Sequence, residues 1–180
     1  MTLFADYEPE APRRALPGDL VLCDATALDL PALAALRAAR GDASLAEARE
    51  AFERQVGRGA LVVVAVTAGV PVAYGVAEQL ALEALPKGWY LTGVVVSPSE
   101  RRRGIAGQLT RHRLAWIGKR ATEAFYFVNE VNRVSIDLHA GFGFEPIAHD
   151  IRVPGVTFQG GRGVLYRAAF SDAGESIGPA

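Results

Sequence analysis

The sequence lacks several features that would assign it to familiar classes of protein. It has one cysteine, Cys23, so no internal disulfide can form, which fits a reducing compartment. Its 19 basic and 20 acidic residues give no basic excess of the kind that a general nucleic-acid binder needs. The longest apolar run, residues 60–66, is far shorter than the roughly 20 residues of a membrane span. We therefore expect a cytoplasmic protein that binds neither nucleic acid nor membrane.

The two ends of the sequence lack the composition of a folded core. Residues 1–18 carry acids and prolines, with no apolar stretch like that of a signal peptide, and predict a flexible lead-in. Residues 171–180 are small and polar and predict a flexible tail. Half of the 180 residues are hydrophobic, which suffices for one core. We predict a single domain over residues 19–170.

Helices and strands are predicted from apolar spacing and from capping residues. Ser44 with Glu47 is a capping-box pattern, and β-branched runs without a 3.6-residue period indicate strands. The predicted helices cover residues 29–40 and 45–56, a segment that begins at Ile105, and residues 133–140. The predicted strands cover residues 20–23, 60–66, 70–78, 90–96, 125–128, 144–151 and 164–170. Strands that are bunched first and separated by helices later favour a mixed α+β sheet.

One strand–loop–helix segment has the composition of an anion site. A strand ends at Ser97-Pro98, three arginines follow at residues 101–103, and Gly104-Ile105-Ala106 opens a helix. Unpaired amides and the partial positive charge at a helix N-terminus suit phosphate, and small residues let a ligand approach the backbone. The alternative is a solvated arginine run beside a glycine needed for packing. The glycine patterns of other phosphate-binding loops are not found in this context.

A second group of residues follows on the next predicted helix. Asn132, Ser135 and His139 are spaced i, i+3 and i+7, so they share one helical face. Asn132 alone has a simpler interpretation as an N-cap, and Ser135 as a small residue needed for packing. After this helix, Gly143 and Phe144 lead into the next strand.

Together the two motifs resemble the GCN5-related N-acetyltransferase (GNAT) superfamily. Its acetyl-CoA signature reads Q/R-x-x-G-x-G/A, which Arg101, Gly104 and Ala106 match. The second motif is matched by Asn132, Ser135, Leu138, Gly143 and Phe144. The resemblance implies a mostly antiparallel mixed sheet of six to seven strands with about four helices. It also implies a V-shaped splay between the two central strands, and acetyl-CoA as the acetyl donor.

The resemblance also implies which residues bind the coenzyme. Its pyrophosphate would lie at the arginine segment, and its pantetheine arm along the preceding strand and the face of the second motif. The implied coenzyme-binding residues are Val94, Val95, Val96, Arg101, Arg102, Arg103, Gly104, Ile105, Ala106, Asn132, Ser135 and His139. No metal site is predicted.

The catalytic groups are where this sequence departs from the family. Tyrosine is common at the position of His139, where it protonates the departing thiolate. Histidine can also donate a proton, with an ordinary pKa of about 6.5 against about 10 for tyrosine. Its alternatives are a hydrogen bond to the sulfur or a structural role. Glu78 is the predicted base, acting through a water, and Glu83 is a second candidate; either can instead be a solvated acid.

The acceptor and the assembly are open at this point. Tyr74 and Trp89 either line an acceptor pocket or pack in the core. The resemblance predicts transfer to an amine of a small molecule, peptide or protein, and it allows a homodimer. The alternatives are a non-catalytic acyl-CoA sensor with the same fold, and a phosphate-binding regulatory domain unrelated to coenzyme A. Cys23 is predicted to be a buried, structural residue rather than a nucleophile.

Overall fold

The computed structural model describes residues 7–41 and 43–170. In chain order its elements are β1 Val21–Asp24, α1 Leu30–Ala38, α2 Leu45–Gly57, β2 Leu61–Thr67, β3 Val70–Leu80, β4 Gly88–Val96, η1 Pro98–Glu100, α3 Ile105–Gly118, β5 Glu123–Asn129, α4 Arg133–Ala140, β6 Glu145–Ile151, η2 Gln159–Gly161 and β7 Gly163–Ala169. This order confirms the one predicted from the sequence. The flexible ends and the single-domain boundary stay predictions, and residues 1–6 and 171–180 lie outside the described residues.

The strands form one mixed sheet in the order β1-β2-β3-β4-β5-β7-β6. The strands are antiparallel to their neighbours except at the centre, where β4 and β5 are parallel. The predicted class, a mostly antiparallel mixed sheet with four helices, is therefore confirmed. A parallel junction needs a crossover, and α3 supplies it by connecting β4 to β5.

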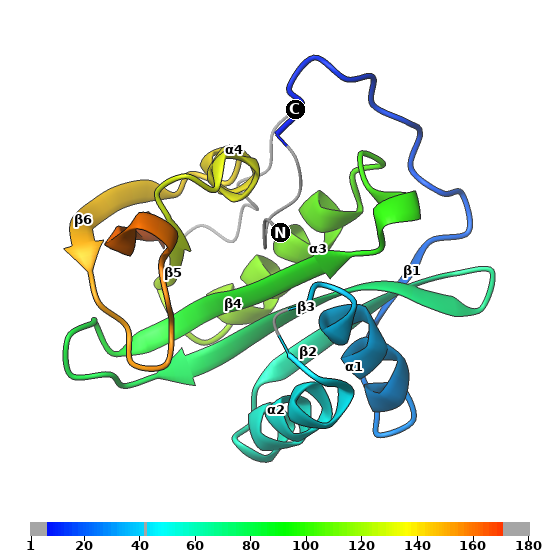
Figure 1. The fold of residues 1–180 in the computed structure, drawn as a ribbon, viewed down its shortest axis with the longest axis horizontal. Helices are drawn as coiled ribbons and strands as arrows, with labels where there is room; N and C mark the ends of the chain where they lie inside the picture. Colours follow the sequence, from blue (N-terminus) through cyan, green and yellow to red (C-terminus); the bar gives the residue numbers. More distant parts are fainter. Residues whose placement is uncertain (1–6, 42, 171–180) are drawn as a thin grey trace.

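Helices cover both faces of the sheet (Figure 1). Leu33 of α1 and Phe52 of α2 pack against one face, in a cluster that includes Tyr74. Leu109 of α3 packs against the other face, with Leu138 of α4 at the edge of the same cluster. Buried apolar side chains from both layers thus hold the sheet between two helix pairs.

Local sequence explains how two of these elements begin and connect. The Ser44 hydroxyl accepts from the Glu47 amide and the Glu47 carboxylate accepts from the Ser44 amide, so the predicted capping box starts α2. Ala68 and Gly69 have φ values of 48° and 75°, the two left-handed residues that a tight hairpin turn needs between β2 and β3.

The central strands separate after a single contact. Within the described residues, Tyr90 with Phe125 is the one register pair between β4 and β5. Beyond it β4 runs toward η1 and β5 toward α4, and Figure 1 shows the two strands diverging. Residues 91–96 of β4, apart from Thr92, therefore pair with β3 on one edge, and none of the six pairs with β5 on the other. This is the predicted splay.

Among the described residues, no helix is long and apolar enough to cross a membrane. The cytoplasmic location stays a prediction.

Candidate functional site

The loop between β4 and α3 exposes backbone amides at the start of a helix. Arg102 has a φ of 62° and Gly104 a φ of 78°, and Gly104 is the N-cap of α3. A left-handed residue other than glycine costs roughly 1–2 kcal/mol, so Arg102 must be held by its surroundings. Left-handed residues at a helix start are typical of concave amide arrangements that bind anions. The loop backbone therefore has a conformation that suits an anion, and phosphate binding there stays a prediction. We call residues 98–104 the arginine loop.

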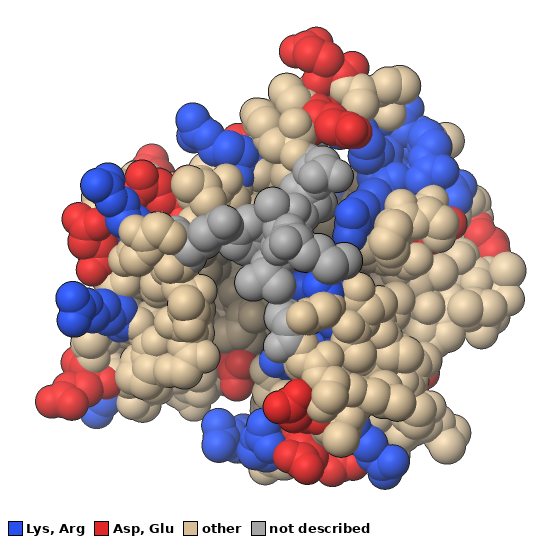
Figure 2. Space-filling model, in the orientation of Figure 1, with Lys and Arg blue, Asp and Glu red and all other residues tan. Residues whose placement is uncertain are grey.

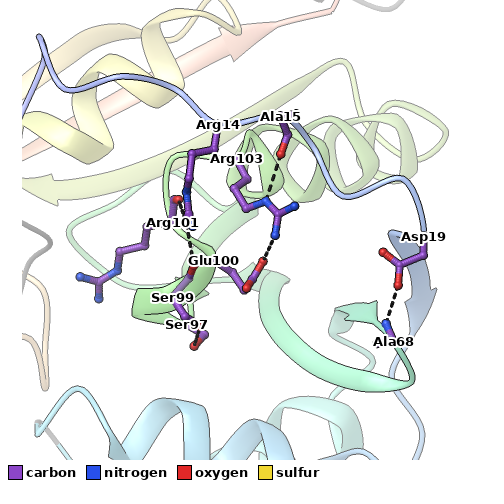
Figure 3. Close-up of polar contacts among 9 residues, drawn as sticks. All are labelled: Arg14, Ala15, Asp19, Ala68, Ser97, Ser99, Glu100, Arg101 and Arg103. Carbon is purple, nitrogen blue, oxygen red and sulfur yellow. Dashed lines mark hydrogen bonds and ion pairs between the residues drawn. The ribbon is translucent and has the colours of Figure 1, made fainter.

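The three arginine side chains of this loop do not share one direction. Arg102 donates to the Glu8 and Ala11 carbonyls, and Arg103 donates to the Ala15 carbonyl at 3.0 Å. Arg103 also pairs with Glu100 at 2.7 Å. Figure 3 shows the Arg101 side chain extending away from Arg14 and Arg103; its one hydrogen bond to described residues runs from Nε to the Val96 carbonyl at 3.4 Å. Of the three, Arg101 has the guanidinium most available to a ligand.

Basic charge is concentrated in this region although the chain is nearly neutral overall. Figure 2 shows blue side chains gathered at the upper right, where Figure 1 places η1 and the start of α3. Arg14 donates to the Ser99 and Arg101 carbonyls, so it lies in this region with the arginines of the loop. A phosphate at the amides of α3 would therefore meet both a helix N-terminus and fixed cations.

The strand predicted to contact the pantetheine arm is β4. Val95 is buried on the face of α1 and α2, whereas Val94 and Val96 pack toward the face of α3. The edge of these three residues that faces β5 is left unpaired by the splay. Their main-chain groups can therefore hydrogen-bond an extended ligand lying between the strands, as the resemblance implies.

The second motif forms the start of α4. The Asn132 side chain is the N-cap and accepts from the Ser135 amide at 3.2 Å. Ser135 lies one turn before His139, and its hydroxyl is 3.4 Å from His139 Nδ1. The capping role of Asn132 is thus present, whereas the predicted coenzyme contacts of Asn132 and Ser135 stay predictions.

His139 is a buried, neutral ring. Nδ1 lies 2.8 Å from the Ser135 carbonyl, so the proton is on Nδ1 and Nε2 is an acceptor with no partner among the described residues. The ring stacks on Tyr126 at 4.0 Å and meets the edge of Phe144. Burial lowers the His139 pKa to about 3, and the charge of Arg113 adds to this effect. At neutral pH the ring therefore lacks the second proton that a cationic acid would donate.

Glu78 lies on the opposite face of the sheet from α3. Its Oε1 accepts from the Gln55 amide at 2.9 Å and from the Thr92 hydroxyl at 2.7 Å. Oε2 makes no hydrogen bond with the described residues, and the buried Gln55 Oε1 also has no partner there. Two oxygen acceptors with free capacity thus lie together beside β4. Glu83, the other predicted base, is exposed in the connection between β3 and β4.

Arg113 of α3 contacts both β3 and β4, and the sequence analysis did not identify it as part of the site. It is fully buried, and Nη1 donates to the Val76 carbonyl at 3.0 Å and to the Gly93 carbonyl at 2.9 Å. The register between β3 and β4 shifts at this point, leaving Thr92 as an extra residue of β4. Burial lowers the Arg113 pKa to about 9, so the guanidinium still carries its charge at neutral pH. Arg113 thus fixes the bulge that turns Thr92 toward Glu78.

The remaining candidates have packing contacts. Tyr74 is buried and meets the ring of Phe52 at 4.9 Å, and Trp89 meets Trp116 at 4.8 Å. Cys23 was predicted to be buried, which is wrong, because β1 lies at the edge of the sheet and leaves this side chain exposed. Gln55 was missed because a single glutamine on a separate element gives no sequence pattern.

The profile of the acetyltransferase (GNAT) family matches residues 30–144, so the chain belongs to the acetyltransferase (GNAT) family. This confirms the predicted family, fold and enzyme class. It also argues against the phosphate-binding regulatory domain unrelated to coenzyme A.

Solved structures of several acetyltransferases share this fold. The ribosomal-protein-alanine N-acetyltransferase from Brucella melitensis has a TM-score of 0.69 and 21% identity, over 83% of this chain and 99% of that one. The ribosomal-protein-S18-alanine N-acetyltransferase from Escherichia coli has a TM-score of 0.69 and 20% identity, over 87% and 97%. The acetyltransferase yncA from Salmonella typhimurium, solved with acetyl-CoA, has a TM-score of 0.67 and 16% identity, over 88% and 98%. No curated protein sequence matches the chain.

Proposed function

We propose that this chain transfers the acetyl group of acetyl-CoA directly to a primary amine of a small molecule, peptide or protein. The observation that carries the proposal is the unpaired edge of β4. The arginine loop follows its C-terminal end, and the Glu78 cluster lies beside it on the other face of the sheet. Donor and acceptor can therefore meet at one strand from opposite sides. Acetyl-CoA would supply a thioester whose carbonyl carbon the amine attacks.

The donor side fits coenzyme A through its backbone and charge. The amides of Gly104, Ile105 and Ala106 begin α3, where the helix dipole favours the pyrophosphate. Arg101 adds a guanidinium with no hydrogen bond to the described part of the N-terminal segment, residues 7–16. The main chain of Val94–Val96 would hold the pantetheine arm in the splay, and Asn132 and Ser135 would border it from α4. Such main-chain contacts orient the thioester without requiring particular side chains.

The acceptor side fits an amine that must lose a proton. Glu78 Oε2 and Gln55 Oε1 are acceptors with free capacity, and an amine nitrogen offers N–H donors. Glu78 would take the proton from the attacking nitrogen directly or through one water. Thr92 and Gln55 hold the other carboxylate oxygen, which keeps the base in place between α2 and β4.

We retain His139 as the candidate that assists the leaving sulfur, although its neutral ring carries only one proton, on Nδ1. Its neutral ring presents Nε2 as an acceptor, which suits an N–H or S–H of the coenzyme. Delivery of a proton to the thiolate would have to come from Nδ1, at the expense of the hydrogen bond to the Ser135 carbonyl. His139 is expected to add no pH dependence to the rate around pH 6.5 in either case, because its pKa is about 3.

A screen of amines tests the proposal. Purified protein is mixed with acetyl-CoA and a panel of primary amines, and free thiol is measured. Because the similar structures include ribosomal-protein-alanine and phosphinothricin N-acetyltransferases, the panel should contain alanine-initiated peptides and phosphinothricin. We expect amine-dependent thiol release with at least one member.

The alternative is a non-catalytic acyl-CoA sensor with the same fold. It is favoured by one observation, the buried His139 ring with a pKa of about 3 at the position of the usual acid. Calorimetry separates the two functions. Binding of acetyl-CoA without thiol release across the whole panel would support the sensor, and absence of binding would refute both.

A further inference from the structure

The N-terminal segment, residues 7–16, lies across the region proposed for the coenzyme. The Tyr7 hydroxyl donates to the Asp137 carboxylate of α4 at 2.7 Å, and seven residues later the Arg14 amide donates to the Arg102 carbonyl of the arginine loop before α3. Figure 1 shows this part of the chain arching over the molecule before it enters β1. Two elements that border the coenzyme site are therefore joined by residues that precede the domain in sequence.

Arg14 contacts three carbonyl groups of the arginine loop. Its backbone amide donates to the Arg102 carbonyl at 2.9 Å. Its guanidinium donates through Nη2 to the Ser99 carbonyl at 2.5 Å and to the Arg101 carbonyl at 2.8 Å (Figure 3). One residue thus binds carbonyl groups at three positions within four residues of the loop.

The loop binds the N-terminal segment in return. Arg102 donates to the carbonyls of Glu8 and Ala11, and Arg103 donates to the carbonyl of Ala15. The side chains of Arg102 and Arg103, whose charge suggests phosphate binding, therefore hold the N-terminal segment instead. The contacts run in both directions, so the conformations of loop and segment depend on one another.

Peptide geometry connects these contacts to the anion site. In a planar trans peptide the carbonyl of one residue and the amide of the next point in opposite directions. The Arg101 and Arg102 carbonyls are bound by Arg14, so the amides of Arg102 and Arg103 point away from it. Neither amide donates to a described residue. The left-handed φ of Arg102 lies between these two peptides and helps to set the direction of their amides.

We propose that Arg14 is a positioning residue for the donor: by binding the carbonyls of the arginine loop, it directs the loop amides toward the pyrophosphate of acetyl-CoA. This inference rests on the proposed function. It assigns the N-terminal segment to the coenzyme site, and it assigns Arg102 and Arg103 to holding that segment. Arg101 is the side chain left for direct contact with phosphate.

Two neighbouring arginines make a matched test. Arg14→Ala removes the side-chain hydrogen bonds to the Ser99 and Arg101 carbonyls and keeps the backbone bond to Arg102, whereas Arg13→Ala removes the same charge from an exposed residue that makes no hydrogen bond with the loop. Calorimetry with acetyl-CoA is expected to show an affinity about tenfold weaker for Arg14→Ala, and a change of less than about threefold for Arg13→Ala. Arg14→Lys should recover part of the loss, because an ammonium reaches fewer of the carbonyls.

A donor without phosphates separates positioning from general damage. With S-acetylpantetheine, KM should be the same for wild type and Arg14→Ala, whereas KM for acetyl-CoA should rise about tenfold in the variant. Thermal unfolding of both variants verifies that they are folded. Equal effects of Arg13→Ala and Arg14→Ala, or equal losses with both donors, would overturn the inference alone. Wild-type protein that does not bind acetyl-CoA would overturn the proposed function, and this inference with it.

Discussion

The two sides of β4 are built in different ways. On the side of α3, the proposed donor site consists mainly of backbone: the amides at the start of α3, left-handed residues and the unpaired strand edge. On the side of α2, the proposed acceptor site consists of side chains from three separate elements, Gln55, Glu78 and Thr92. A backbone site requires glycine and small residues at fixed spacing, so it leaves a motif. A side-chain cluster assembled by the fold leaves none.

The largest effect is expected at the acceptor side. Glu78→Gln keeps the shape of the cluster but removes the base, so kcat should fall about 100-fold or more while acetyl-CoA affinity is unchanged. Thiol release and calorimetry measure the two quantities. Glu83→Gln is the control, because Glu83 is exposed and outside the cluster. A loss of kcat in Glu83→Gln instead would reverse the assignment.

A second change tests Arg113, whose hydrogen bonds link β3 to β4. A Cβ at Gly75 would lie 2.8 Å from Arg113 Nε in a buried place, so Gly75→Ala should destabilise the fold by about 1–3 kcal/mol. Gly93→Ala is the control on the neighbouring strand, because a Cβ there meets no atom within 4 Å. Urea unfolding measures the free energy of unfolding of the two variants. Equal stabilities would mean that Arg113 does not hold β3 and β4 as tightly as its hydrogen bonds indicate.

The His139 ring gives stability a specific pH dependence. Its pKa is about 3 in the folded chain and about 6.5 when unfolded, so between these values the unfolded state binds more protons. The contribution of the neutral His139 ring to the free energy of unfolding is therefore fully present above pH 6.5, and it is lost as pH falls toward 3. In this range His139 adds at most about 1.4 kcal/mol per pH unit to the slope of unfolding free energy against pH. His139→Phe keeps a ring in the stack and should remove this slope from urea-unfolding data. An unchanged slope would contradict the buried neutral state.

The smallest effect is expected at the helix start of the donor side. Gly104→Ala places a Cβ on a residue with φ of 78°, at a cost of about 1 kcal/mol, and should weaken acetyl-CoA binding more than it lowers kcat. Gly107→Ala, one turn later in α3 with open space and no left-handed φ, should be neutral or slightly stabilising. Calorimetry on the pair tests the comparison, and similar affinities would mean that the backbone at Gly104 is not essential.

The same contrast explains what the sequence could and could not predict. The order of elements followed from apolar spacing and caps such as Ser44, and Gly104 after a strand marked the loop. The partners of Arg102 and Arg103 could not be predicted, because residues 8–15 carry no periodic pattern and are positioned only by the folded loop. The burial of Arg113 was missed because an arginine on a helix is ordinarily exposed, and here it donates to carbonyls of two strands and to the Leu109 carbonyl and Thr110 hydroxyl of its own helix.

The candidate acid shows the limit of a residue-by-residue comparison. The position of His139 followed from the motif, and its ordinary pKa suggested a proton donor near neutral pH. Burial against Tyr126 and Phe144 lowers the His139 pKa, and this burial is set by the packing of α4 on the sheet. The residue could be located from sequence, but its protonation state could not.

A single-turnover reaction tests the central claim most directly. The complex of protein and acetyl-CoA is mixed with an amine identified in the screen, and free thiol, acetylated amine and acetylated protein are followed together by mass spectrometry. Direct transfer predicts that thiol and acetylated amine appear at the same rate and in equal amounts, with no acetylated protein. Thiol release without acetylated amine, or an acetylated chain that forms and decays first, for example at the exposed Cys23, would contradict it.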